Sequence, residues 1–176
     1  MIIKVKEDDL DFNCSNLSQR CFESLIKIYK VRMSEETTIG VKERFYEELT
    51  EGQRALFMFY VYYNHISKSH IELYWWSAYF MAQPKKWAAL KACFKYFNDE
   101  PFLLLLEKIE QELKQHNHPT TLENFSITRD ELNDNKELHA SFESLYAIFE
   151  NINPVTITKI NTAIKKNLQE FIQIEN

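Results

Sequence analysis

The sequence predicts an all-α fold, in which a single compact domain of about seven helices surrounds one central apolar helix at about residues 54–64. Only two of the 176 residues, Gly40 and Gly52, are glycine and only four are proline. The chain therefore has few of the tight turns that β-hairpins require. Ser, Thr and Asn stand instead at spacings typical of helix caps. A hydrophobic fraction of 45% in a chain of this length is enough for one domain, residues 1–176, with a sizeable core.

The first elements are predicted from periodicity. Residues 1–6 alternate weakly between apolar and charged side chains, which is typical of a short strand or an extended arm. Apolar side chains three to four residues apart predict a helix over residues 15–31 and a shorter one over 38–49.

Two capping boxes mark the next two helices. Thr50 with Gln53 opens residues 55–63, a segment that is apolar on every face. A helix without a polar stripe must be surrounded by others, so we place it at the centre of the fold. Ser69 with Glu72 opens a helix rich in aromatic residues, which Pro84 ends.

Proline and a third capping box set the remaining boundaries. Pro84 and Pro101 each suit the first turn of a helix, and these helices run to about Phe97 and His116. Residues 116–124 are predicted to be a loop, the one soft boundary of the domain. Thr128 with Glu131 predicts a helix through Phe149, and Asn151 to Pro154 separates it from a final helix that reaches about Ile172.

The charge is acidic overall and unevenly distributed. The formal net charge is −5, which argues against a generally basic nucleic-acid binder and a polybasic membrane anchor. Residues 99–150 contain twelve acids and four bases, whereas residues 84–97 contain four lysines and no acid. Both runs are either solvated helix faces or interaction surfaces steered by charge. The candidate acidic surface comprises Glu107, Glu110, Glu131 and Glu137.

Cysteine usage and the N-terminal residues bear on the compartment. Cys14, Cys21 and Cys93 form no CxxC motif, so we expect buried, reduced thiols. The N-terminal residues are unlike an export signal, and the longest uncharged run has thirteen residues, which is too short for a transmembrane span. We therefore expect a cytoplasmic protein, and the excess of Lys, Asn and Ile suggests a bacterial source.

No motif for catalysis, a metal or a cofactor is visible. Two glycines twelve residues apart exclude a phosphate-binding loop and a serine-hydrolase elbow. His65 and His70 lie five residues apart across a predicted helix break, which does not suit a helical metal pair. We interpret His139 and Glu143, four residues apart, as surface partners. The sequence predicts no catalytic residue, no metal and no cofactor.

The aromatic residues are concentrated in one stretch. Fourteen of the 25 lie between Phe57 and Phe97. Such residues build a core, a protein interface or a ligand pocket, and each buried Tyr hydroxyl needs a partner. The candidate binding residues are Tyr63, Asn64, His65, His70, Tyr74, Trp76 and Tyr79.

Parts of this pattern resemble the DMP19-like helical proteins of bacteria. The resemblance rests on the stretch from Leu49 to Phe59, on Tyr63 to His65, on Glu72 to Trp76 and on the acidic helix that follows Asp99. Ser67 to Ser69 replaces the Gly-Gly turn of that family. The resemblance implies an all-α fold and, from one branch of the family, an acidic surface that imitates DNA.

Two classes of function follow. We expect a helical protein that acts by protein–protein interaction, as a regulator or an immunity-type inhibitor, through an aromatic patch and the acidic surface. The alternative is a small-molecule-binding protein or enzyme with a pocket near Tyr63, His65, His70 and Trp76. A homo-oligomer with an aromatic interface is a third possibility.

Overall fold

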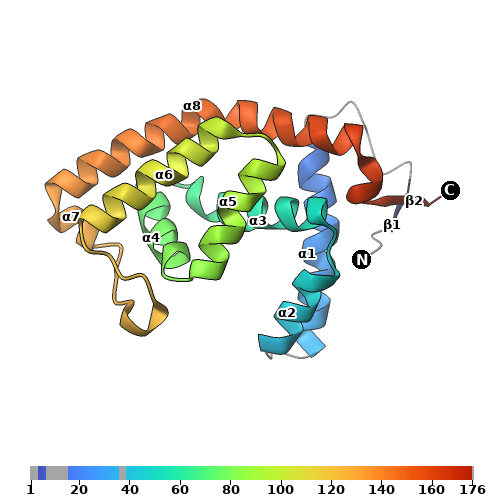
Figure 1. Cartoon of the computed structure of the whole chain (residues 1–176), viewed down its shortest axis with the longest axis horizontal. Coiled ribbons are helices and arrows are strands. Elements are labelled where there is room, and N and C mark those ends of the chain that lie inside the picture. Colours follow the sequence, from blue (N-terminus) through green and yellow to red (C-terminus); the bar gives the residue numbers. More distant parts are fainter. Residues whose placement is uncertain (1–3, 7–15, 36–38, 176) are drawn as a thin grey trace.

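Helices make up almost all of the fold, which confirms the predicted all-α class (Figure 1). A computed structural model describes residues 4–6, 16–35 and 39–175. Cys14 lies outside the described residues. The helices are α1 (Leu17–Glu35), α2 (Ile39–Glu48), α3 (Glu51–Ile66), α4 (His70–Met81), α5 (Pro84–Tyr96), α6 (Glu100–Gln115), α7 (Glu131–Asp134) and α8 (Lys136–Lys166), with 3₁₀ turns η2 (Leu122–Asn124) and η3 (Leu168–Glu170).

A short parallel pair of strands joins the two ends of the chain. β1 (Lys4–Lys6) pairs with β2 (Gln173–Glu175), and Lys4 lies opposite Gln173. The strand that residues 1–6 predict is therefore present over Lys4–Lys6. β2 occupies residues that follow the end of the predicted final helix.

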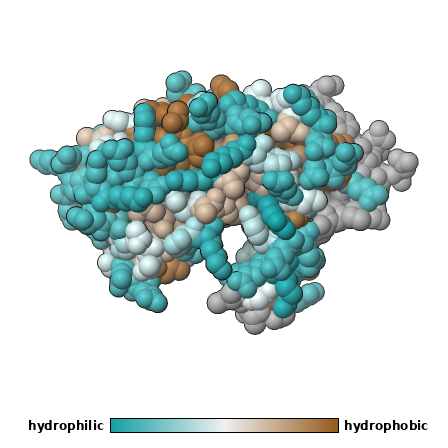
Figure 2. Space-filling model, in the orientation of Figure 1, coloured by the Kyte–Doolittle hydropathy of each residue, from teal (hydrophilic) through white to brown (hydrophobic). Residues whose placement is uncertain are grey.

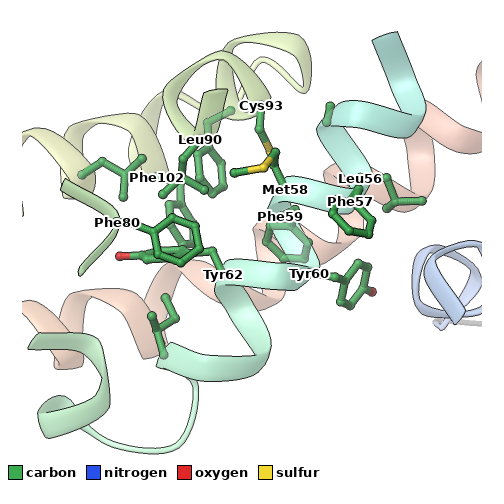
Figure 3. Packing of buried hydrophobic residues seen from close by; sticks show 14 of the residues in the cluster. Leu56, Phe57, Met58, Phe59, Tyr60, Tyr62, Phe80, Leu90, Cys93 and Phe102 are labelled. Carbon is green, nitrogen blue, oxygen red and sulfur yellow. The ribbon is translucent and has the colours of Figure 1, made fainter. Parts of the chain in front are cut away.

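The predicted central helix is α3, which packs against α1, α4 and α5. The Thr50 side chain accepts a hydrogen bond from the backbone N–H of Gln53, and the Gln53 side chain accepts one from that of Thr50, which confirms the capping box. Figure 3 shows side chains from α3 packing with side chains from α4, α5 and α6. Phe59 and Tyr62 are completely buried, so α3 lies at the centre of the core.

The predicted break at Asn151 to Pro154 is wrong, because α8, which is 31 residues long in all, continues through Pro154 without interruption. It runs beside α6 across the top of the view in Figure 1. Beyond the proline, Thr156 and Lys159 both donate hydrogen bonds to Asp99, a carboxylate that is only 2% exposed at the start of α6. This tertiary contact and the burial of Ile160 favour helix beyond Pro154 despite its missing N–H.

The predicted helix start at Thr128 is also wrong. Glu131 accepts a hydrogen bond from the backbone N–H of Thr128 at 3.1 Å, which is half of the expected capping box. The helix that follows is only the single turn α7. Asn135 then caps α8 by accepting from the N–H of Leu138. The sequence also predicts a final helix that reaches about Ile172, whereas α8 ends at Lys166. The 3₁₀ turn η3 then brings Phe171 into the core.

Candidate functional site

An aromatic face lies along α4, where Trp75, Trp76 and Tyr79 meet His65 from α3 and Phe125 from the segment after η2. We call these five half-buried residues the aromatic face. Ser69 caps α4 and sets where this helix begins. Side chains three and four residues apart on the helix then point to the same side. Trp76 stacks on His65 with ring centroids 3.5 Å apart, and Trp75 stacks on Tyr79 at 5.2 Å. Phe125, from the segment after α6, meets Trp75 and Tyr79 edge-on.

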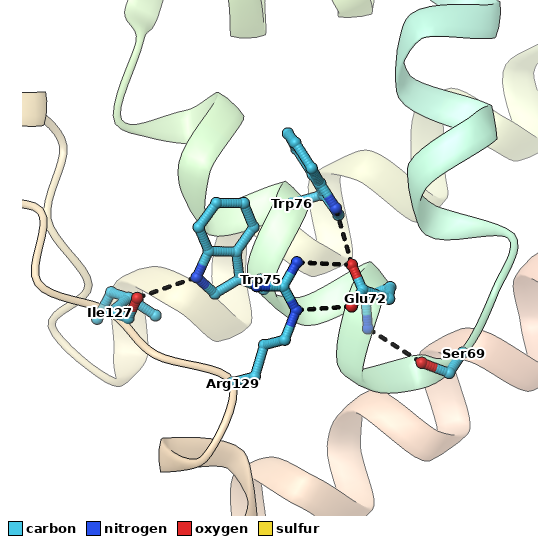
Figure 4. A network of polar contacts seen from close by, with 6 residues as sticks. All are labelled: Ser69, Glu72, Trp75, Trp76, Ile127 and Arg129. Carbon is cyan, nitrogen blue, oxygen red and sulfur yellow. Dashed lines mark hydrogen bonds and ion pairs between the residues drawn. The ribbon is translucent and has the colours of Figure 1, made fainter.

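A polar network holds that segment against α4 (Figure 4). The Arg129 guanidinium donates to both carboxylate oxygens of Glu72, at 2.6 and 2.9 Å, and lies 4.4 Å from the Trp75 ring centroid. Trp76 Nε1 donates to Glu72, and Trp75 Nε1 donates to the carbonyl of Ile127. The hydrogen bonds from Arg129 lower the pKa of Glu72. Both indole N–H groups are thus satisfied within the chain, and this face is partly covered.

A second cluster lies between the start of α4 and the first turns of α8. His70 Nε2 lies 3.3 Å from His139 Nε2, and His139 Nδ1 lies 3.6 Å from a carboxylate oxygen of Glu143. Of this cluster, the sequence predicts only the contact between His139 and Glu143, which share a helix face. His70 stands 69 residues from His139, so no local signal indicates that the two meet.

Tyr74 lies one turn after His70 and is fully buried. Its hydroxyl pairs with His118 Nε2 at 2.8 Å, and burial raises the pKa of Tyr74. Burial likewise lowers the pKa of His118. This contact fastens the segment after α6 to α4.

The structure does not gather the seven predicted binding residues into one site. His65, Trp76 and Tyr79 share the aromatic face, whereas His70 and Tyr74 point toward α8 and the segment after α6. Two further residues lie elsewhere: Tyr63 stacks on Phe59 and accepts a long hydrogen bond from Asn153, and Asn64 is exposed.

A groove lies between α6 and α8. Its volume is about 480 Å³, and it is lined by Lys108, Gln111, Glu112, Glu137, Ala140, Ser141, Ser144 and Leu145. Figure 2 shows exposed hydrophobic atoms over the neighbouring part of α6 and α8, among largely hydrophilic ones. Leu104 of α6 and Val155 of α8 are 51% and 57% exposed.

The four acids of the predicted acidic surface have different surroundings. Glu107 and Glu137 are exposed and make no ion pair within the described part of the chain. Glu131 is half-buried at the start of α7.

Glu110 is not a free negative charge. Burial raises its pKa, but hydrogen bonds from Lys114, Lys91 and Trp87 outweigh that effect and lower the pKa to about 2. Lys91 belongs to the basic run, so part of the predicted charge polarisation is neutralised where α5 meets α6.

Two further observations bear on function. In comparisons with known proteins, no family model, no curated protein and no solved structure matched the chain. The resemblance to the DMP19-like proteins therefore stays a prediction. None of the helices in the described ranges combines the length and the apolar character needed to cross a bilayer.

Proposed function

We propose that this protein acts by binding another protein, and that a basic segment of the partner contacts the acidic face formed by α6 and α8. The observation that carries the proposal is that exposed carboxylates on these two helices lack a cation within the described chain. They are Glu100, Glu107 and Glu137. Solvent-exposed carboxylates of this kind attract a positively charged partner over about 10 Å.

The groove and its neighbourhood support a protein partner. The groove is lined by both charged and small uncharged side chains, and exposed Leu104 and Val155 lie on the same two helices. A mixture of apolar and charged groups is typical of protein interfaces. The aromatic face supports this choice less well, because the Ile127 carbonyl and the Glu72 carboxylate already accept hydrogen bonds from its two indole N–H groups.

The buried, unpaired thiols of Cys21 and Cys93 suit a reducing compartment, and we propose the cytoplasm. Burial raises the pKa of Cys21 to about 12 and raises that of Cys93, so neither thiol is activated. The proposal therefore gives neither residue a nucleophilic role.

A defined peptide tests the binding surface. We expect a fluorescent, helical peptide rich in Lys and Arg to bind the wild-type protein, with an affinity that falls as salt is added. The double variant Glu107→Lys, Glu137→Lys changes the charge of this face by four units. At about 0.5 kcal/mol for each exposed charge, we expect an affinity loss of about 30-fold.

The matched control is the double variant Glu43→Lys, Glu47→Lys. Both residues are exposed on α2, which extends away from α6 and α8 in Figure 1. The change in net charge is the same, so the control separates the face from the overall charge. Equal losses in the two double variants, or no binding by the wild type at low salt, would refute the proposal.

A further inference from the structure

We infer that His70, His139 and Glu143 form a binding site for a divalent transition metal, with Zn²⁺ as the best-suited ion. One ligand atom from each residue can be chosen so that all three lie within 4.8 Å of one another. The site joins the first residue of α4 to one face of α8, so a bound ion would link two helices. It does not depend on the acidic face proposed above.

The distance between the two imidazoles carries the inference. Zn²⁺ holds imidazole nitrogens at about 2.0–2.1 Å in a tetrahedral arrangement, which places two such ligands about 3.3–3.4 Å apart. His70 Nε2 and His139 Nε2 are 3.3 Å apart. Nitrogen and acceptor in a protein hydrogen bond usually lie about 2.7–3.2 Å apart. The observed separation of the two nitrogens is therefore longer than a usual hydrogen bond and matches the spacing of two imidazole nitrogens bound to the same ion.

Glu143 supplies the negative charge and a third ligand. It follows His139 by one turn of α8, so both side chains leave the same face of the helix. Its carboxylate oxygen lies 3.6 Å from His139 Nδ1, and its side chain is 58% exposed. An exposed side chain can rotate toward the ion without disturbing the core. Two His and one carboxylate are a ligand set that Zn²⁺ accepts, with water in the fourth position.

The proton balance of binding is simple. One imidazole nitrogen of the facing pair carries the hydrogen in the metal-free contact, because two lone pairs would repel. On binding, that ring gives its Nε2 proton to water and takes up one proton on Nδ1, so it stays neutral and both Nε2 atoms donate lone pairs to the ion. Neutral imidazole and ionised carboxylate are the forms that bind metals.

The test is titration of the full chain, without a histidine tag, with Zn²⁺ by calorimetry and with Co²⁺ by visible absorption. We expect one ion per chain and an absorption spectrum typical of tetrahedral Co²⁺. At a free Zn²⁺ concentration about 100 times the dissociation constant, the melting temperature rises by about 5–10 °C.

Three variants locate the site. His70→Gln and His139→Gln each abolish the Co²⁺ spectrum, and Glu143→Gln weakens Zn²⁺ binding by about 10-fold or more. The matched control is His116→Gln, because His116 pairs with Glu112 and Asn135 outside the cluster. Circular dichroism without metal verifies that each variant folds.

The inference is overturned if wild-type protein takes up no Zn²⁺ at millimolar concentration. It is also overturned if His116→Gln removes binding while His70→Gln and His139→Gln retain it, since the ion would then sit at another histidine. Equal Zn²⁺ binding by the wild type and by the His70→Gln, His139→Gln double variant would also overturn the inference, because neither histidine would then hold the ion.

Discussion

The hydrogen bond between Tyr62 and Ser77 joins α3 to α4 in the middle of the core, and the two side chains can be removed separately. Both residues are completely buried, and their hydroxyl oxygens lie 2.6 Å apart. Burial raises the pKa of Tyr62, as expected for a hydroxyl enclosed by apolar groups. The Tyr62 ring also packs against Phe80, with centroids 5.3 Å apart.

The two single variants are expected to differ in stability. Tyr62→Phe keeps the ring and leaves the Ser77 hydroxyl free to turn to the carbonyl one helical turn earlier, so it costs about 1 kcal/mol. Ser77→Ala leaves the phenol hydroxyl buried without a partner and costs about 2–3 kcal/mol. The double variant lacks both groups, so its loss is smaller than the sum of the single losses by about 1–2 kcal/mol.

Urea-induced unfolding, followed by circular dichroism, measures these free energies from the midpoint and the slope. The slopes must agree among the four proteins, so that the midpoints report stability alone. Strictly additive losses, or a Ser77→Ala variant as stable as the wild type, would refute the argument that this hydroxyl pair is desolvated and mutually dependent.

Three further predictions concern other contacts. Glu110→Gln lowers the free energy of unfolding by about 1–2 kcal/mol above pH 4.5, a value reduced for solvent screening. Because the folded-state pKa is lowered to about 2, this difference disappears as the pH falls from 4.5 toward 2, and urea titrations across that range check it. Gly52→Ala places a Cβ 2.8 Å from the Tyr96 hydroxyl and 2.9 Å from the Phe171 ring, so a net loss of about 1 kcal/mol is expected despite the helix propensity of Ala; an unchanged urea midpoint would contradict it. Pro154→Ala restores a backbone N–H inside α8 at an exposed position and raises the thermal unfolding midpoint, with a gain of about 1–3 kcal/mol. An unchanged midpoint would contradict this, since it would show that the proline is accommodated without cost.

The start of most helices was predictable because the signals act within one turn of the chain. Thr50 bonds to Gln53 and Ser69 to Glu72, and each contact depends only on residues three apart. Pro84 lies in the first turn of its helix for an equally local reason, since its ring suits that position. The uninterrupted apolar character of α3 likewise predicted a central position, which the buried side chains confirm.

The sequence by itself determined the all-α class and the apolar helix at its centre, because backbone capping and apolar periodicity are properties of neighbouring residues. Only the tertiary structure decided the course of α8 through Pro154, the pairing of Glu110 with Lys91 and the meeting of His70 with His139. These partners are far apart along the chain, and packing alone brings them within a few ångströms. Contacts between distant residues depend on how whole helices pack, which a local pattern does not specify.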